Sequence, residues 1–439
     1  MERTVIKDIK KNIGNTIRCL GWVQKVRDHS KVVFVVLRDR SGTVQCVAKN
    51  ENLCGVAKSL NPESIVEITG TATERPSKEK RDEEDVEISI ESINVISQAE
   101  ELPFDLNTNL NIDTLLDNRP ITLRSKNQMA IFMIQECVVN AFREYFNKND
   151  FVEFQSPKLV GDDAEGGAGV FKTQYFGYEA CLATSPQLYK QIMVGVFERV
   201  FTIGNVYRAE KHSTTRHLNE YTSLDFELGF IDDHKDVMKH AEGFIRQAVS
   251  NIENVCNEYV EKFDVPKVLL PKETFPLVTL KEAQEIVEKE SDEKCVGASD
   301  LDPSHERILC EFSKKEYKSD VIFVTHYPIS KRPMYTYEDE NAKGLTKSFD
   351  LLFRGKEIAT GGQRIHSYEQ LKENIKKRNL NIENFSFYLQ AFKYGMPPHG
   401  GAGLGLERIT AALLGIQNVK EASLFPRDMG RIDKPLKDI

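Results

Sequence analysis

The chain has 439 residues, of which 40% are hydrophobic and 29% are charged, an ordinary composition for a globular protein. These proportions exclude a collagen-like, low-complexity or wholly disordered chain, and at roughly 150 residues per domain the length suggests two or three domains. The 59 Lys and Arg residues against 67 Asp and Glu give a net charge of −8, which excludes a protein that is basic throughout. Residues 1–50 nevertheless carry 11 basic and 4 acidic side chains, a local excess typical of a phosphate-binding face.

Membrane and export signals are not visible in the sequence. No apolar run reaches the roughly 18 residues of a membrane span, and the first residues lack the apolar core of a signal peptide. The eight cysteines form neither a Cys-x-x-Cys motif nor a zinc-binding spacing. We therefore expect a cytoplasmic protein with reduced thiols and no membrane contact.

Five β-rich segments bounded by turn signals occupy the first hundred residues: 17–26, 32–37, 43–48, 64–73 and 86–96. This pattern favours a five-stranded OB-fold β-barrel, a fold that often binds oligonucleotides, over residues 1–104. A barrel that serves only as a structural cap is the alternative. The charged stretch 78–85 (KEKRDEED) is expected to be a solvated hairpin tip.

Beyond the barrel, residues 105–129 are expected to form a hinge with a few helical turns, because Pro120 disfavours a helix centre. Apolar residues then recur at three- and four-residue spacing, which predicts an amphipathic helix over 130–149, followed by a strand that ends at Ser156-Pro157. Residues 232–320 are expected to be a helical insertion. The tail from residue 345 predicts strands and one long helix after Gly405, so residues 130–439 form an α+β domain.

The first chemical motif is a predicted hairpin at residues 201–227, FTIGNVYRAEKHSTTRHLNEYTSLDFE. Its strands flank a polar loop with cations at the mouth, among them Arg208, Lys211, His212, Arg216 and His217. Guanidinium groups match phosphate oxygens and stay charged at any working pH. The hairpin therefore suits an anionic ligand that carries phosphate, although surface hairpins with scattered salt bridges are common.

The second motif, GGAGLGLER at 400–408, combines glycines with a Glu407-Arg408 pair at the start of a predicted helix. Glycines let the backbone approach a ligand closely. A lone Gly-x-Gly is weak and usually marks a turn, so the charged pair carries most of this signal.

The third motif, FDLLFRGKEIATGGQRIH at 349–366, carries Asp350 and Glu357 on a predicted hairpin. Carboxylates beside a phosphate site suit Mg²⁺, which typically takes one or two of them together with substrate phosphates. Taken alone, each carboxylate is more typical of a surface residue.

In this order the motifs resemble those of the class II aminoacyl-tRNA synthetases, with Ser156-Pro157 closing the first motif, residues 208–210 in the second and residues 403–408 as the third. The segments SPQLYKQ (185–191), GGQRIH (361–366) and FKYGMPPHGGAGLGLER (392–408) are similar to aspartyl-tRNA synthetases of the archaeal and eukaryotic type, in class IIb. GWVQKVRD (21–28) and LRDRSGTVQ (37–45) extend the resemblance into the barrel. It therefore covers nearly the whole chain.

The resemblance implies an antiparallel sheet flanked by helices and an OB barrel that binds the anticodon. It also implies ATP-dependent activation of L-aspartate to aspartyl-adenylate and transfer to the 3′ end of tRNA(Asp), with alignment and charge neutralisation supplying most of the acceleration. Arg208 and Arg408 are the implied catalytic residues, at the α- and γ-phosphates. Mg²⁺ is implied at Glu357 and Thr360, with Asp350 as a further ligand; Thr360 replaces the usual Ser. The implied ATP-binding set is Arg208, Ala209, Glu210, Arg216, His217, Leu218, Glu357, Gly405, Leu406, Glu407 and Arg408.

For aspartate itself, the family positions are Glu165, Ser185, Gln187, Leu188, Tyr189, Lys190, Arg208, Asp225 and Arg364. Lys190 and Arg364 are implied to hold the side-chain carboxylate, because asparagine would leave two buried cations poorly paired. Glu165 lies in a Gly-rich loop suited to close over the ligand. Thr184 stands where the family frequently has Gln.

In the barrel, Arg27, Phe34 and Gln45 match the positions that bind the anticodon, and an aromatic ring can stack on a base. Phe34 lies in the apolar run VVFVVL, where an aromatic residue is more often part of a core. Gln24 and Ser77 are positions at which relatives that accept only tRNA(Asp) differ from relatives that also accept tRNA(Asn). Some strict relatives have Trp and Lys at these positions. This chain has neither, so we expect it also to charge tRNA(Asn).

Three alternatives remain open: an asparaginyl-tRNA synthetase on the same scaffold, a tRNA-independent amino acid ligase, and a non-catalytic tRNA-binding module. The segments 361–366 and 332–335 follow the aspartyl pattern and argue against the first. The barrel argues against the second, and the intact charged residues argue against the third. The helix at 130–149 and Pro157 resemble the dimer interface of the family, so we expect a homodimer.

Overall fold

The computed structural model describes all residues except 76–84, 162–168, 212–213, 435 and 437–439. Ser77, Glu165, His212 and most of the predicted hairpin tip at 78–85 therefore lie outside the described residues. The chain divides into two compact units, Met1–Thr108 and Asn109–Ile439. Within the described ranges, every helix is too short or too polar to cross a membrane.

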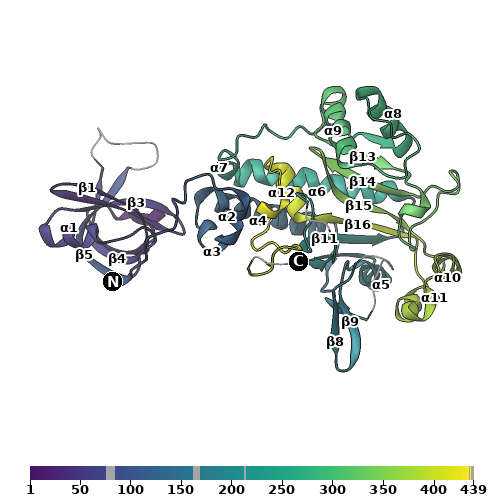
Figure 1. The fold of residues 1–439 in the computed structure, drawn as a ribbon, viewed down its shortest axis with the longest axis horizontal. Coiled ribbons are helices and arrows are strands. Elements are labelled where there is room, and N and C mark those ends of the chain that lie inside the picture. The colour runs from purple at the N-terminus through teal and green to yellow at the C-terminus, as the bar shows by residue number, and fades with distance from the viewer. Residues whose placement is uncertain (76–84, 162–168, 212–213, 435, 437–439) are drawn as a thin grey trace. The chain divides into compact units, whose positions relative to one another are not determined.

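The N-terminal unit is a closed five-stranded barrel with the strand order β1-β2-β3-β5-β4, as predicted (Figure 1). Buried and half-buried side chains alternate strictly along β2, because successive side chains of a strand point to opposite faces. The inward-facing set, which includes Val33, Val35, Cys46 and Ile68, forms the core of the barrel. Its elements are η1 (Ile6–Asn12), β1 (Thr16–His29), β2 (Val32–Asp39), β3 (Gly42–Ala48), α1 (Glu51–Lys58), β4 (Ile65–Glu74) and β5 (Val86–Ser97).

The larger unit is built on an eight-stranded sheet with the order β12-β13-β14-β15-β16-β11-β10-β6. The six strands from β13 to β10 pair antiparallel, and β12 and β6 pair parallel at the two edges. Those strands are β6 (Val152–Glu153), β10 (Arg199–Tyr207), β11 (Glu220–Gly229), β12 (Leu277–Thr279), β13 (Val321–Thr325), β14 (Ser348–Phe353), β15 (Lys356–Arg364) and β16 (His399–Gly405). A separate small sheet contains β7 (Leu159–Val160), β8 (Lys172–Tyr175) and β9 (Tyr178–Leu182).

Helices cover the large sheet and enclose three hydrophobic clusters. The main core lies between the sheet and the helices α4 (Lys126–Lys148), α6 (His234–Val255) and α12 (Leu406–Leu413). A second cluster involves α5 (Gln187–Phe197), α10 (Tyr368–Lys377) and α11 (Ser386–Lys393), and a third involves α8 (Leu280–Glu290) and α9 (Pro303–Tyr317). The remaining helices are α2 (Ile112–Asp117), α3 (Arg119–Thr122), α7 (Asn257–Val260), η2 (Ile329–Lys331), η3 (Ile382–Phe385) and η4 (Val419–Ala422).

The stretch 232–320 contributes to the frame of the larger unit. Helix α6 begins with a capping box at Asp233 and Asp236, and its buried face contributes Phe244 and Ile245 to the main core. Strand β12 extends the main sheet through its pairing with β13. Helix α9 carries Glu306 in its first turn.

Two details near the C-terminus differ from the sequence prediction. The glycine-rich segment before Gly405 is strand β16 and not a turn. The helix after Gly405 has only eight residues and is not long. It stops because Gly415 adopts a left-handed conformation (φ +65°), which glycine tolerates at a helix end, and Ile416 then donates its N–H to the carbonyl of Ala411.

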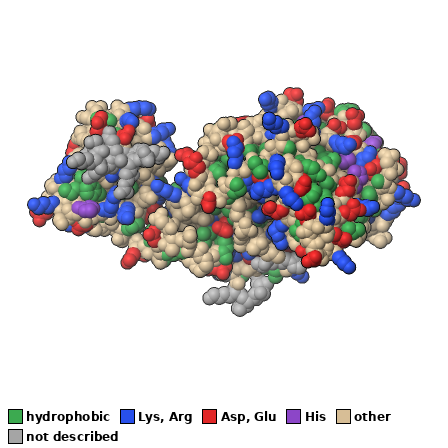
Figure 2. All heavy atoms as spheres, turned by 90° about the horizontal axis from the view of Figure 1, so that it is seen from above, with side chains coloured by type: hydrophobic (Ala, Val, Ile, Leu, Met, Phe, Trp, Pro, Cys, Tyr) green, Lys and Arg blue, Asp and Glu red, His purple; other side chains and the backbone are tan. Residues whose placement is uncertain are grey.

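The surface carries charges of both signs, and the cysteines are reduced, as the sequence predicts. Figure 2 shows basic and acidic side chains interspersed over the visible face of the larger unit. All eight cysteines are free and buried. Burial raises the pKa of Cys310 to about 12, so this thiol stays protonated and unreactive.

Candidate active site

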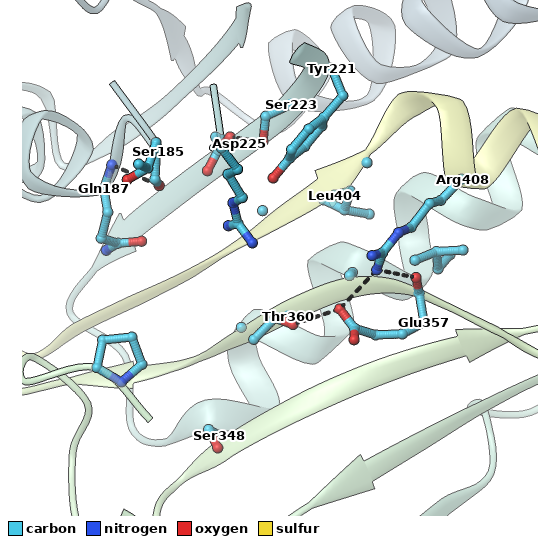
Figure 3. A pocket seen from close by; sticks show the side chains of 18 of the residues that line it. Ser185, Gln187, Tyr221, Ser223, Asp225, Ser348, Glu357, Thr360, Leu404 and Arg408 are labelled. Atoms are coloured by element: carbon cyan, nitrogen blue, oxygen red, sulfur yellow. Dashed lines mark hydrogen bonds and ion pairs between the residues drawn. The ribbon is translucent and has the colours of Figure 1, made fainter. Parts of the chain in front are cut away.

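A cavity of about 300 Å³ opens beside β11, β15 and β16 in the larger unit (Figure 3). Most of the residues predicted for ligand binding line it: Ser185, Gln187, Lys190, Arg208, Glu210, Arg216, His217, Leu218, Asp225, Glu357, Thr360, Arg364, Gly405, Glu407 and Arg408. The fold thus brings together segments that lie more than 200 residues apart in the chain.

Five predicted residues do not line the cavity: Ala209, Leu188, Tyr189, Asp350 and Leu406. Leu188 and Tyr189 pack against the cluster behind α5, since they lie on another side of that helix from Gln187 and Lys190. Leu406 belongs to the main core. Four of them, all except Asp350, are adjacent in sequence to a residue that does line the cavity.

One end of the cavity contains two buried cations that share one carboxylate. Arg364 donates from Nε to Oε1 of Glu227 at 2.9 Å, and Nζ of Lys190 lies 3.3 Å from Oε2 of Glu227. Lys190 also donates to Oδ1 of Asp225 at 2.9 Å and to the carbonyl of Ala402 at 3.1 Å. Two cations and two carboxylates therefore occupy one water-poor region, where unpaired charge is costly.

Strand β11 explains how the carboxylates reach this region. Ser223, Asp225 and Glu227 alternate with Leu224 and Phe226, so one face of the strand is polar and the other lies in the main core. The sequence analysis missed Glu227. Its two-residue spacing from Asp225 was the signal that could have found it.

The glycine-rich strand β16 makes room for these side chains. Glu227 pairs in register with Gly401, and a Cβ atom at that glycine would collide with Oε2 of Glu227 and with the carbonyl oxygen of Phe226. The carbonyl of Gly401 also accepts a hydrogen bond from Nη2 of Arg364 at 2.8 Å. A residue without a side chain is required here by a close approach within the protein and not by a turn.

The charge state of Glu227 follows from its neighbours. Complete burial would raise the pKa of this carboxyl, but the charges of Arg364 and Lys190 outweigh burial and hold the pKa below its ordinary value. Glu227 is therefore ionised at neutral pH. It keeps both cations in place while partly neutralising them.

The hairpin of β10 and β11 carries Arg208 at the cavity wall. Asn219 clamps the hairpin mouth, since its side chain donates to the carbonyl of Arg208 at 2.6 Å and its own carbonyl accepts from the N–H of Arg208 at 2.9 Å. The guanidinium of Arg208 lies 5.7 Å from the ring of Tyr221, a distance that allows a cation–π contact. The hairpin predicted from the sequence thus holds Arg208 in the cavity wall.

The other end of the cavity contains cations that are closer to solvent. Arg216 forms a two-pronged ion pair with Glu306 of α9, with Nη1 3.3 Å from Oε1. Arg408 donates from Nη1 to the carbonyl of Glu357 at 3.1 Å and lies 3.4 Å from its carboxylate (Figure 3). The sequence analysis missed Glu306, which also accepts the backbone N–H of Glu357 at 2.9 Å.

The three metal candidates occupy different environments. Thr360 donates to Oε1 of Glu357 at 3.1 Å, and both line the cavity. Asp350 lies behind them and pairs with Arg332 at 2.9 Å. In the described ranges, no group of three or more His, Cys, Asp or Glu side chains is arranged to hold a metal ion. The oxygens of Glu357 and Thr360 suit an ion whose remaining ligands are substrate phosphates and water, which is the usual way that Mg²⁺ binds.

Glu407 lies in surroundings that disfavour its ionised form. It is buried at the start of α12, and both of its carboxylate oxygens accept the backbone N–H of Thr222, at 3.0 and 3.1 Å. Burial raises the pKa of Glu407 to about 7, and the hydrogen bond from Thr222 opposes this rise. The carboxyl is therefore partly protonated at neutral pH.

In the barrel, the three predicted anticodon-binding residues lie close together, although Gln45 is buried and accepts a hydrogen bond from Arg75 at 2.9 Å. Arg27 pairs in register with Phe34 and donates to Oε1 of Gln45 at 3.2 Å. Phe34 is half-buried and alternates with the core residues Val33 and Val35, so it faces outward, with its ring 5.5 Å from that of His29. Gln24 lies at the irregularity between Val23 and Lys25 in β1.

This combination of fold and cavity defines a class of protein. The family model "tRNA synthetases class II (D, K and N)" matches residues 111–429, and "OB-fold nucleic acid binding domain" matches residues 17–96. The chain belongs to the class II aminoacyl-tRNA synthetases of the D, K and N group, and it is therefore a ligase.

Particular relatives narrow this class. The chain is 42% identical to aspartate–tRNA(Asp/Asn) ligase of Thermus thermophilus, over 98% of this chain and 99% of that protein. It is 38% identical to aspartate–tRNA(Asp) ligase of Thermoplasma volcanium, over 98% of this chain and all of the relative. Among solved structures, asparaginyl-tRNA synthetase of Pyrococcus horikoshii with asparaginyl-adenylate superposes with a TM-score of 0.91 at 30% identity, covering 99% of this chain and 100% of that one.

Proposed function

We propose that the protein is an aspartate–tRNA ligase that activates L-aspartate with ATP and transfers it to tRNA(Asp) and also to tRNA(Asn). The observation that carries this proposal is the pair of buried cations, Lys190 and Arg364, at the amino acid end of the cavity. Relatives named aspartate–tRNA ligase, at about 40% identity over nearly the full length, support the same assignment.

Arg364 is the cation with a hydrogen-bond donor left for the substrate. Its Nε and Nη2 donate to Glu227, Gly401 and Gln187, whereas Nη1 donates to no described residue. Lys190 has three acceptors within 3.3 Å and supplies mainly charge. An aspartate carboxylate would accept a hydrogen bond from Nη1 of Arg364 and would neutralise its charge. A neutral asparagine amide in the same place would leave the buried positive charges of Arg364 and Lys190 poorly paired.

Alignment of two anions is the main chemical task of this site. Arg208 holds the aspartate α-carboxylate against the α-phosphate, so that a carboxylate oxygen attacks phosphorus and pyrophosphate leaves. Arg216 and Arg408 bind the outer phosphates after exchanging their carboxylate partners for phosphate oxygens. A Mg²⁺ ion held by Glu357 and Thr360 would neutralise phosphate charge when bound. A ribose hydroxyl of the tRNA then takes the aspartyl group, and AMP leaves.

The unit assignments follow the same proposal. Residues 1–104 bind the anticodon, residues 105–129 form a hinge, and residues 130–439 form the catalytic domain with a helical insertion at about 232–320. Helix α4 and Pro157 support a homodimer, which light scattering at micromolar concentration tests directly. Cytoplasmic localisation stays a prediction.

The deciding experiment measures ATP–pyrophosphate exchange with aspartate and with asparagine, followed by aminoacylation of purified tRNA(Asp) and tRNA(Asn). We expect exchange with aspartate only, and aspartylation of both tRNAs. Exchange with asparagine instead would favour the second candidate, an asparaginyl-tRNA synthetase, which the similarity to the Pyrococcus horikoshii structure keeps open. Refusal of tRNA(Asn) alone would restrict the proposal to tRNA(Asp).

A further inference from the structure

Behind the amino acid end of the cavity, buried polar side chains form one continuous chain of hydrogen bonds. Nη2 of Arg364 donates to Oε1 of Gln187 at 3.3 Å, and Nε2 of Gln187 donates to Oε1 of Gln191 at 3.0 Å. Nε2 of Gln191 lies 2.8 Å from Nε2 of His399, whose Nδ1 lies 2.9 Å from the carbonyl oxygen of Pro397. Gln191 and His399 are both 0% exposed, and the proposed chemistry uses neither of them directly.

The chain has a direction, and His399 sets it. A carbonyl oxygen can only accept a hydrogen bond, so Nδ1 of His399 carries the proton that faces Pro397. Burial lowers the pKa of His399 to about 4, against the attraction of Glu227, so the ring is neutral and its Nε2 is an acceptor. Gln191 must therefore turn its NH₂ group toward His399.

The orientation of Gln191 then fixes that of Gln187. With its NH₂ group committed to His399, Gln191 turns Oε1 toward two donors, Nε2 of Gln187 and the hydroxyl of Tyr388 at 3.1 Å. Gln187 donates to that oxygen, so its own Oε1 is left facing Arg364. One imidazole tautomer thus determines which end of a second amide, two hydrogen bonds away, meets the guanidinium.

We infer that His399 and Gln191 are positioning residues for aspartate recognition, because they hold the Gln187 amide with its oxygen toward Arg364. The inference rests on the proposed function, in which Nη1 of Arg364 meets the aspartate side chain. A Gln187 amide rotated by half a turn would place an NH₂ group against the guanidinium, and two donors repel each other. Arg364 would then lose an acceptor on Nη2, and Nη1 would no longer be aimed correctly.

The helix geometry gives this chain its rigidity. Gln187 and Gln191 are one turn apart on α5 and share a face, so their amides meet without strain. His399 opens β16, the strand that also supplies the carbonyl of Gly401 to Arg364. The same strand therefore contacts Arg364 directly through its backbone and indirectly through the two glutamines.

The test compares Gln191→Met with Tyr388→Phe in aspartate-dependent ATP–pyrophosphate exchange by the full-length protein. The methionine variant keeps the side-chain volume but removes the amide that transmits the orientation. We expect it to raise the KM for aspartate by about tenfold or more while the KM for ATP stays within about twofold, since one hydrogen bond to a charged group is at stake. The phenylalanine variant removes a different donor to the same Gln191 oxygen and leaves the direction intact, so we expect less than about a twofold change.

A second variant guards against a folding defect in the first. His399→Asn removes the fixed acceptor, and we expect the same selective rise in the KM for aspartate. Equal rises in both KM values, or a KM for aspartate within about twofold of wild type in both variants, would overturn the inference. A wild-type protein that activates asparagine instead of aspartate would overturn the proposed function itself, and the wild-type lane of the same assay reports this separately.

Discussion

The two ends of the cavity hold their cations in different ways. At the proposed amino acid end the side chains of Lys190 and Arg364 are 1% and 6% exposed, whereas at the proposed nucleotide end those of Arg216 and Arg408 are 17% and 31% exposed. The buried cations share Glu227, and Lys190 also pairs with Asp225 on the same strand. The partly exposed cations pair with Glu306 and Glu357, which come from separate elements.

This difference matches two tasks. Selectivity needs charges that are already in place before the ligand arrives, since preorganised groups cost no rearrangement during the reaction. Phosphate binding needs cations that can exchange one anion for another, and a cation near solvent gives up its carboxylate partner at lower cost. In the proposed function, the cavity therefore has a rigid end that selects the amino acid and an exchangeable end that binds the nucleotide.

The largest effect is expected at the rigid end. Arg364→Gln removes the guanidinium that presents Nη1 to the ligand, and we expect kcat/KM for aspartate in ATP–pyrophosphate exchange to fall by roughly 10³-fold or more, because a buried charge contact is lost. Arg364→Lys is the control: it keeps the charge but loses the fork, so its loss is expected to be smaller. Unchanged turnover in the glutamine variant would show that the charge of Arg364 does not select aspartate.

Glu407 tests whether the nucleotide end carries a cost in stability. Its pKa is about 7 in the folded protein, above the ordinary value of 4.5, so between those pH values the folded protein keeps a proton that the unfolded chain has released. The free energy of unfolding therefore falls as the pH rises through this interval. Glu407→Gln removes the ionisation, and we expect it to stabilise the protein by up to about 3 kcal/mol at pH 8 and by much less near pH 5.

Thermal unfolding of wild type and Glu407→Gln at both pH values measures this difference. The exposed Glu383 supplies the control, since Glu383→Gln removes the same charge from the surface. Equal stabilisation by Glu407→Gln at pH 5 and pH 8 would show that burial of the carboxylate is not its cause.

Arg216 tests whether the exchangeable end acts only on the nucleotide. Arg216→Met removes a phosphate-binding cation, and we expect the KM for ATP to rise about 10- to 100-fold, because charge-assisted hydrogen bonds are lost. The KM for aspartate is expected to stay within about twofold. Glu306→Gln breaks the same ion pair but keeps Arg216, so an equal effect in that variant would mean that the pair itself, and not phosphate binding, is responsible.

How much of this site the sequence could predict depends on the range of the interactions. The hairpin with Arg208 and the acidic hairpin with Glu357 were confirmed, because each forms between neighbouring segments with clear alternation. The partner of Arg216 was missed, since Glu306 lies 90 residues away on a helix without a recognisable motif. The contact between Gln191 and His399 spans 208 residues and follows only from the completed sheet.

The glycine-rich segment shows a subtler limit. The sequence shows the glycines, and such a pattern usually predicts a turn. At Gly401 the close approach comes from the side chain of Glu227 and the backbone of Phe226 on the adjacent strand, which becomes apparent only once β11 and β16 are paired in register. A run of glycines gives no indication of whether a ligand, a turn or another part of the protein makes the close approach.

The barrel extends the comparison to a surface that, in the proposed function, binds a base instead of a small anion. Phe34 faces outward beside Arg27 and Gln45, and its ring is only half-buried. Phe34→Leu keeps an apolar side chain of similar reach but removes the π face, so we expect the KM for tRNA(Asp) in aminoacylation to rise by about five- to tenfold, near the lower end of base–aromatic stacking. ATP–pyrophosphate exchange needs no tRNA and is expected to stay unchanged, which makes it the internal control. A variant that loses exchange as well would indicate that Phe34 supports the fold of the barrel, whereas an unchanged KM for tRNA would remove this ring from the anticodon-binding surface.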